Sequence, residues 1–289
     1  MRHPNVPESL DGWAILHRMF RFERRRWDAL GAGGREAVER EAAALFDALG
    51  RGGDGDLGLA QLLGHKGELM LTHYARSFDA LGEVQARVDK LELRDFLTPM
   101  ESYVSVLELG LYADTAKIHA ELRDRGLKPH SDDWNAAFDA MLDAAAREPR
   151  NAARLFARIP QRRYVCFYPM NKKRVPGDNW YATPYDERAA MMLEHGKIGR
   201  SFHGHVTQVI SGSIGFDDWE WGVDLYADDP LVFKKLVYAM RFDEASARFG
   251  EFGRFWTGMQ FSVAQLGTFL AGEASPALVA AGSAQPVLR

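Results

Sequence analysis

The order of segments in the second half of the chain constrains its fold most. The pattern of apolar residues and turn residues predicts six elements in a row. They are a strand at 163–168, a helix at 183–196, strands at 205–210 and 219–226, a helix from 229, and a strand at 253–263. This β-α-β-β-α-β order is that of a ferredoxin-like unit. We therefore expect an α+β domain here.

Residues that typically begin or end helices and strands set the expected boundaries of these elements. Pro169 ends the first strand, because proline cannot donate to a sheet ladder. Thr183 can cap the helix with Pro184 in its first turn, and Gly196 is expected to close that helix. His195 would then lie in the last helical turn.

The first half shows a similar but weaker alternation of predicted strands and helices. Apolar spacing predicts helices at 34–49 and 81–91 and a further helix capped by Ser131. Strands are expected at 69–74 and 103–109, whereas 12–22 contains β-favouring residues without clean alternation. This half could be a degenerate copy of the second, although no residue-level repeat is visible.

Composition excludes several classes of protein. The chain has 289 residues, 46% of them hydrophobic, which is enough for one large or two modest cores. A net charge of −4 gives no positive field for nucleic acid. Cys166 is the one cysteine, so no internal disulfide can form. With no membrane span and no signal peptide in view, we expect a soluble cytoplasmic protein.

Histidines provide the first candidate site. His195 follows two methionines, and a neutral imidazole there could bind iron, although a helix C-terminus also favours a protonated ring. A non-haem site with His203 and His205 is a weaker reading, because no carboxylate stands at ligand spacing. Surface positions are the default expectation for His203 and His205.

Other features fit an anionic, flat ligand. Lys172, Lys173 and Arg174 form a cationic loop that suits carboxylate or phosphate, although such a loop can equally serve solubility. Tyr164, Cys166 and Tyr168 share one strand face, as do Trp219, Trp221, Val223 and Leu225. Either face could instead be part of the hydrophobic core. Nucleotide-binding and hydrolase motifs are missing.

Taken together, four segments carry a resemblance to a known family. YVCFYPMNK, EHGKIGRSF, ISGSIGFDDWEWGVDLYADD and MRFDEASARFGEFG resemble the coproheme decarboxylases of the chlorite dismutase superfamily, in the form found in monoderm bacteria. The likeness is dense over 154–259 and thinner at ESLDGWAILHRMF and YVSVLELG. It implies two ferredoxin-like halves in one chain, a dimeric α/β-barrel, assembled as a homopentamer. The halves would be 1–152 and 153–272, with a flexible tail at 273–289.

The resemblance also implies roles for individual residues. His195 matches the proximal iron ligand, Tyr168 the tyrosine that becomes the catalytic radical, and Lys172 a catalytic lysine beside a reacting propionate. Arg154 and Ser246 match residues that hold porphyrin carboxylates, and Gln208 takes the distal position above the iron. The remaining porphyrin contacts would come from the rest of the YPMNK motif, at Pro169, Met170 and Asn171.

The implied reaction is oxidative decarboxylation. Fe-coproporphyrin III (coproheme) would be substrate and redox cofactor, hydrogen peroxide the co-substrate and haem b the product. A non-catalytic haem carrier is the alternative from another class, but it has no need of Tyr168 and Lys172. Another activity of the superfamily is the third reading, and Gln208, where chlorite dismutases place an arginine, argues against chlorite turnover. The segment 113–151 is longer and more helical than the family's usual connection, and it weakens the expectation of a pentamer.

Overall fold

The structure is a computed structural model that describes residues 3–279. Its strands are β1 (Ser9–Phe22), β2 (Gly55–Leu62), β3 (Leu69–Ala75), β4 (Leu97–Gly110), β5 (Tyr164–Lys172), β6 (Arg174–Val175), β7 (Asp178–Asn179), β8 (Thr207–Gly212), β9 (Trp221–Ala227), β10 (Gly250–Phe252) and β11 (Trp256–Phe261). Its α-helices are α1 (Arg24–Asp28), α2 (Ala32–Arg51), α3 (Phe78–Asp89), α4 (Tyr112–Asp124), α5 (Asp132–Arg147), α6 (Pro149–Leu155), α7 (Tyr185–Ser201), α8 (Leu231–Met240), α9 (Glu244–Ala247) and α10 (Leu266–Ala271). Short 3₁₀ helices are η1 (Glu92–Phe96), η2 (Trp180–Ala182) and η3 (Val263–Gln265).

A large antiparallel sheet organises the molecule. Its strand order is β10-β5-β11-β2-β3-β1-β4-β8-β9, and an additional pairing of β5 with β9 joins strands from the two ends. The strands therefore form a closed ring, in the order β5, β11, β2, β3, β1, β4, β8 and β9. Strand β10 also pairs with β5, next to β11. Closure removes most exposed strand edges. The expected α+β class is confirmed.

The interior of the ring holds an aromatic and aliphatic core contributed by both halves of the chain. Ile15, Met19 and Tyr74 from the first half pack with Phe167 and Tyr226 from the second. One histidine–carboxylate pair lies within this core. The Nε2 atom of His17 is 3.0 Å from Asp224 Oδ1, and both side chains are fully buried.

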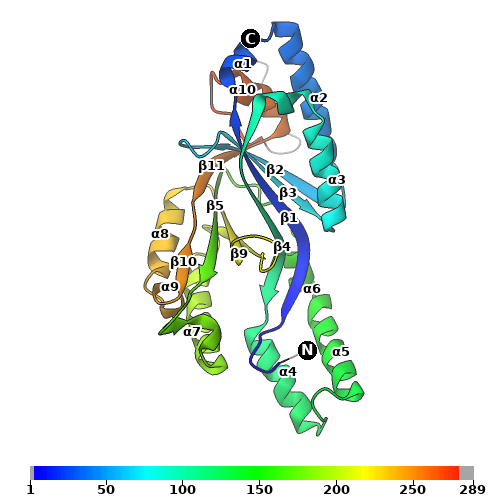
Figure 1. Ribbon diagram of the computed structural model, residues 1–289, viewed down its shortest axis with the longest axis vertical. Helices are drawn as coiled ribbons and strands as arrows, with labels where there is room; N and C mark the ends of the chain where they lie inside the picture. The colour runs from blue at the N-terminus through cyan, green and yellow to red at the C-terminus, as the bar shows by residue number, and fades with distance from the viewer. Residues whose placement is uncertain (1–2, 280–289) are drawn as a thin grey trace.

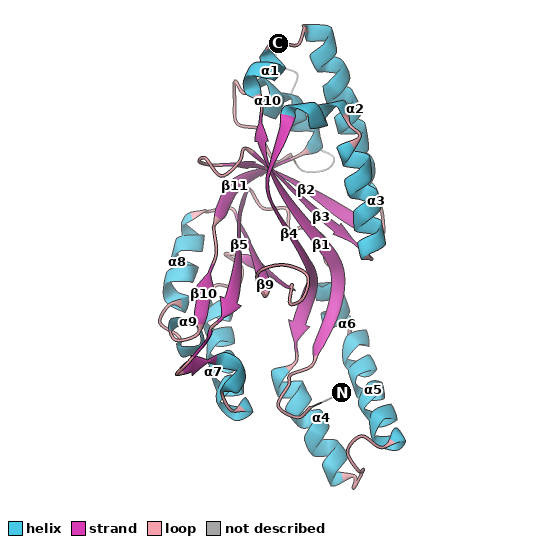
Figure 2. Ribbon diagram, viewed as in Figure 1, coloured by secondary structure: helices cyan, strands magenta, loops and turns pink. Residues whose placement is uncertain are grey.

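Helices cover the outside of the ring in separate layers (Figures 1 and 2). Helices α2 and α3 lie over β2, β3 and β1, at the upper right of Figure 1. Helices α7, α8 and α9 lie beside β5, β9 and β10 at the lower left. Helices α4, α5 and α6 form a third group at the lower right, where α6 packs on β1 and β4.

The segment 113–151 is helical, as expected from its sequence. It comprises most of α4, all of α5 and the start of α6. Ser131 caps α5 by accepting a hydrogen bond from the backbone N–H of Trp134 at 3.2 Å. The α4–α5 pair has its own small core of Ile118, Leu122, Trp134 and Phe138. These two helices project from the ring in Figure 1.

Both expected boundaries of the 183–196 helix are wrong. Helix α7 does not end at Gly196 but continues to Ser201, so His195 lies inside the helix rather than in its last turn. A helical glycine costs only about 1 kcal/mol relative to alanine, and tertiary contacts of α7 override this penalty. Thr183 is not its N-cap either: that position is Pro184, and the Thr183 hydroxyl donates to Asn179 O.

Strand β5 runs through Pro169 to Lys172 instead of ending there. The reason lies in its neighbours: β11 pairs with β5 as far as Phe167, and β10 resumes the pairing at Met170. Pro169 sits opposite this interruption, where its carbonyl accepts from Gly253 N at 2.9 Å. The missing N–H therefore breaks no regular ladder. The single strand expected at 253–263 is correspondingly divided into β10 and β11.

The expected tail at 273–289 is described only as far as Val279. Within that part, Ser262 N donates to Ala277 O at 3.1 Å, and Arg163 Nη1 donates to Pro276 O at 2.7 Å. Residues 280–289 lie outside the described range. Between residues 3 and 279, no helix has the length and apolar character needed to span a bilayer.

Candidate functional site

The outer face of the second-half sheet carries the first part of the site. Tyr164, Cys166 and Tyr168 all belong to one apolar cluster on this face, as their alternation predicted. Tyr168 is paired in register with Val223, and Leu225 has Cys166 on one side and Gln208 on the other. Gln208 and Tyr168 therefore face the same side, because register partners share a face. Helix α8 packs over part of it through Val232, Phe233 and Leu236.

Tyr168 is held in an aromatic environment. Its ring stacks on Phe255, with centroids 4.4 Å apart, and lies 6.0 Å from Phe252. Burial raises the pKa of the Tyr168 phenol well above its usual value, and a negative charge on nearby Cys166 would raise it further. The phenol is thus neutral at physiological pH, and it can be oxidised only by losing a proton together with an electron.

His195 lies on α7, and a buried carboxylate fixes its ring. Nδ1 lies 3.0 Å from Asp243 Oδ2, and the Asp243 side chain is 2% exposed. The Ser246 hydroxyl donates to the same oxygen at 3.1 Å and lies 3.4 Å from His195 Nδ1. The sequence alone placed these three residues on separate segments, and the fold brings them together.

This contact selects the tautomer of His195. A carboxylate can only accept, so Nδ1 carries a proton, and in the neutral ring Nε2 then keeps its lone pair. Metal-binding histidines usually have such a partner on the second nitrogen. Asp243 is positioned by α9, where it is the N-cap and accepts from Ser246 N at 3.0 Å. The arrangement fits an iron porphyrin bound through Nε2.

Lys172 is buried at the edge of the same site. Its Nζ donates to Ala245 O at 2.6 Å and lies 4.6 Å from the centroid of the Trp180 ring. Burial lowers its pKa to about 8, although the charges of Asp243 and Glu220 oppose that shift. No carboxylate of residues 3–279 lies within ion-pair distance of Nζ, so the ammonium can form a direct ion pair with a carboxylate ligand.

Gln208 lies close to the helix that carries His195. Its Nε2 donates to Gly199 O at 3.2 Å, one turn after His195. A Cβ at Gly199 would come within 3.3 Å of the Gln208 amide and of Met240, so glycine permits this approach.

The other four predicted porphyrin-binding residues are Pro169, Met170, Asn171 and Arg154, and they differ in burial. Pro169 is buried and Met170 half-buried on β5, and Asn171 accepts from the backbone N–H of Glu220 at 2.8 Å. Arg154 is exposed on α6, which packs on β1 and β4. Figure 1 shows α6 across the molecule from α7, and no hydrogen bond or ion pair recorded for the described residues joins Arg154 to His195, Asp243 or Ser246.

Sequence reasoning missed two residues of this region. Asp243 could have been found from the D-x-x-S spacing to Ser246, which is typical of a helix N-cap. Arg188 lies on α7 seven residues before His195, and its side chain is buried. Nothing in the local sequence distinguishes it from a surface arginine.

The remaining histidines do not join a metal site. His203 and His205 are exposed, as expected. Within the described part of the chain, no three histidine, cysteine, aspartate or glutamate side chains are grouped to hold a metal ion. This removes the non-haem reading of His195, His203 and His205.

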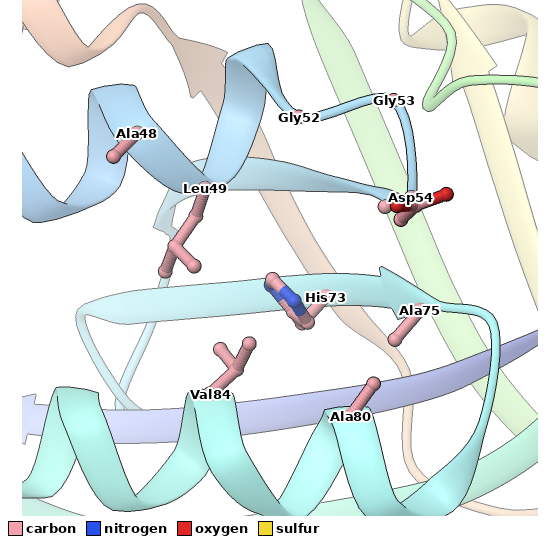
Figure 3. Close-up of a pocket in the computed structure, with 10 residues that line it drawn as sticks. Ala48, Leu49, Gly52, Gly53, Asp54, His73, Ala75, Ala80 and Val84 are labelled. Carbon is pink, nitrogen blue, oxygen red and sulfur yellow. The ribbon is translucent and has the colours of Figure 1, made fainter.

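A small cavity of about 180 Å³ lies elsewhere, between α2, α3 and β3 (Figure 3). His73 points into it, and burial together with the charge of Arg87 lowers the pKa of this histidine to about 4. None of the predicted site residues lines this cavity.

The fold and the site together identify the class of protein. The chain belongs to the chlorite dismutase family, whose family model matches residues 35–261. Among individual proteins, it is 39% identical to a coproheme decarboxylase of Thermus thermophilus, over 93% of this chain and 98% of that protein. The coproheme decarboxylase of a second strain of the same species matches equally.

Solved structures show the same likeness. A structure described as a novel heme-binding protein from Thermus thermophilus has a TM-score of 0.79 at 38% identity, covering 94% of this chain and 100% of that one. Chlorite dismutase from Candidatus Nitrospira defluvii, in complex with imidazole, has a TM-score of 0.67 at 18% identity, covering 90% and 96%. The latter likeness concerns the fold alone.

Proposed function

We propose that this chain is a coproheme decarboxylase, which uses hydrogen peroxide to convert two propionates of Fe-coproporphyrin III into vinyl groups and so yields haem b. The observation that carries the proposal is the pairing of His195 on α7 with buried Asp243 at the start of α9, both helices lying beside β5, which carries Tyr168 (Figure 1). The name and near full-length coverage of the Thermus relatives support it.

Two sets of residues would bind the substrate. His195 would ligate the iron through Nε2, with its ring held by Asp243. Lys172 would pair with a propionate, because its buried ammonium has no carboxylate partner among residues 3–279. Ser246, Gln208 and the Pro169–Asn171 segment would border the porphyrin. Arg154 would require a movement of α6 or of its own side chain to reach a carboxylate.

The chemistry would divide between the substrate's iron and Tyr168. The iron porphyrin supplies oxidising power once it has reacted with peroxide. Tyr168 would lose a proton and an electron together, and its radical would take a hydrogen atom from a propionate side chain. Loss of a second electron and of carbon dioxide leaves a vinyl group. Each propionate thus consumes one peroxide and releases one carbon dioxide and two waters.

The arrangement of the chain supports two ferredoxin-like halves. The first half has the strand order β2-β3-β1-β4, and the second has the equivalent order β8-β9-β5-β11. Helices α2 and α3 would correspond to α7 and α8. We infer a duplicated unit closed into one barrel, and we keep the cytoplasmic homopentamer as part of the proposal on the strength of the family resemblance.

The proposal is tested by following porphyrin masses. Purified protein is loaded with Fe-coproporphyrin III and titrated with hydrogen peroxide. We expect a product that has lost one carboxyl group and then a product that has lost two, identified as haem b. Coproheme that binds but keeps all four carboxylates under peroxide would leave only a carrier function.

A further inference from the structure

Among residues 3–279, Arg188 is a buried cation that forms no ion pair. Its side chain on α7 is among the buried charged groups, with the residue only 5% exposed. Nε donates to Thr183 O at 3.1 Å, and Nη2 donates to Asn5 O. No carboxylate of residues 3–279 forms an ion pair with this guanidinium. Its hydrogen-bond partners are thus uncharged: two backbone carbonyls and the Tyr112 hydroxyl.

Such a burial is costly unless a charge of opposite sign completes it. Arginine offers five N–H donors in a planar fork, and these three partners use only part of this set. The remaining donors can form hydrogen bonds to a carboxylate. A carboxylate ligand would therefore both neutralise the guanidinium and satisfy its hydrogen bonds.

Two aromatic side chains connect Arg188 to Lys172, another buried cation that forms no ion pair among residues 3–279. The Lys172 ammonium rests on the Trp180 ring. The Tyr112 hydroxyl interacts with the side chains of both Trp180 and Arg188. Lys172, Trp180, Tyr112 and Arg188 therefore form a continuous row, with a cation at each end.

Arg188, at one end of this row, lies on the same helix as His195. Residues seven apart lie on one face of a helix, and the rise between Arg188 and His195 is about 10 Å. Met191 and Met192 lie between them in the sequence and pack in one apolar cluster with Trp180 and Phe249. A porphyrin ligated by His195 would carry its carboxylates at its rim, away from the iron, and a cation about two helical turns from His195 could meet one of them.

We propose that Arg188 binds a carboxylate of the porphyrin substrate, with Lys172 taking a second one. This inference rests on the proposed function and adds a specificity-determining residue to it. Substrate would complete an ion pair that the polypeptide leaves open. The competing role is structural, in which Arg188 only ties the N-terminal segment at Asn5 to α7.

A porphyrin without iron isolates this interaction from ligation by His195. Metal-free coproporphyrin III and its tetramethyl ester are titrated, in the same dilute detergent, into wild type, Arg188→Gln and Arg188→Lys, by porphyrin fluorescence. We expect Arg188→Gln to weaken binding of the free acid about 10- to 100-fold, the range of a charge-assisted hydrogen bond. Arg188→Lys keeps the charge but loses the fork, and we expect a smaller loss. Binding of the ester should be the same in all three proteins.

Arg125→Gln, at an exposed position just after α4, is the matched control and should change neither titration. Melting temperatures report any loss of the tie to Asn5. Equal losses for acid and ester, or unchanged binding of the acid by both Arg188 variants, would overturn the inference. A wild type that binds neither porphyrin nor coproheme would instead refute the proposed function. If Arg188→Gln does not fold, the acid-against-ester comparison in Arg188→Lys decides.

Discussion

His195 Nδ1 and Asp243 Oδ2 lie 3.0 Å apart, which joins the middle of α7 to the N-cap of α9. The same carboxylate accepts from the Ser246 backbone N–H and hydroxyl, so its position is fixed by groups other than the histidine. This contact sets both the tautomer and the orientation of the ring. It is the relationship on which iron ligation in this chain depends.

Asp243→Asn should therefore weaken coproheme binding about 10- to 100-fold, the usual effect of losing the partner of a ligating histidine. An amide can present its N–H to Nδ1 and so favour the wrong tautomer. Soret titrations measure the affinity. Glu244→Gln, at the adjacent exposed position, is the control and should bind as wild type does. Equal affinity in Asp243→Asn would show that the contact does not support ligation.

Lys172 should make porphyrin binding sensitive to alkaline pH. Burial lowers its pKa to about 8, so below that pH the ammonium is available to a carboxylate, and above it the charge is lost. Affinity for metal-free coproporphyrin III should fall as the pH rises through about 8. Lys172→Arg should move the fall to higher pH, and Lys172→Met should remove it. A wild-type profile identical to that of Lys172→Met would contradict this role.

The same pKa shift predicts the opposite trend for the stability of the ligand-free protein. The unfolded chain holds the Lys172 proton up to its ordinary value of 10.5, whereas the folded chain releases it at about 8. The unfolded state binds more protons in that window, so stability rises with pH there. Urea unfolding should show this gain for wild type relative to Lys172→Met between these two pH values. A parallel course of the two proteins would count against it.

The buried pair of His17 and Asp224 should hold the two halves of the barrel together, since one residue comes from β1 and the other from β9. Asp224→Ala leaves a buried histidine without its partner, and such changes cost about 3–5 kcal/mol. Urea unfolding measures the loss. Asp143→Ala, which breaks an exposed pair with Arg147, should change stability little. Comparable effects at the two sites would show that burial of the first pair does not matter.

Periodic segments were predictable, and their confirmation has a physical basis. The helix expected at 34–49 and the strand expected at 69–74 lie within α2 and β3, because each buries one continuous apolar face or surface. Strand β2 gave no such signal, since Gly55 and Gly58 dilute its pattern. A Cβ at Gly55 would lie 2.4 Å from Tyr74 O, so close strand packing requires the glycine.

The errors came from local rules that tertiary contacts override. Gly196 was read as a helix end, yet α7 continues because its far end packs against Gln208 and α8. Asp243 and Arg188 were missed because what distinguishes them is the presence or absence of a partner distant in sequence. Such pairing emerges only when α7, α9 and the segment at Asn5 meet.

The central claim, that this site decarboxylates coproheme through Tyr168, is tested most directly by Tyr168→Phe with Tyr164→Phe as its same-face control. Both variants are loaded with Fe-coproporphyrin III, titrated with hydrogen peroxide and followed by porphyrin mass. We predict that both bind coproheme as wild type does, that Tyr164→Phe yields haem b, and that Tyr168→Phe retains all four carboxylates. Full conversion to haem b by Tyr168→Phe would contradict the account.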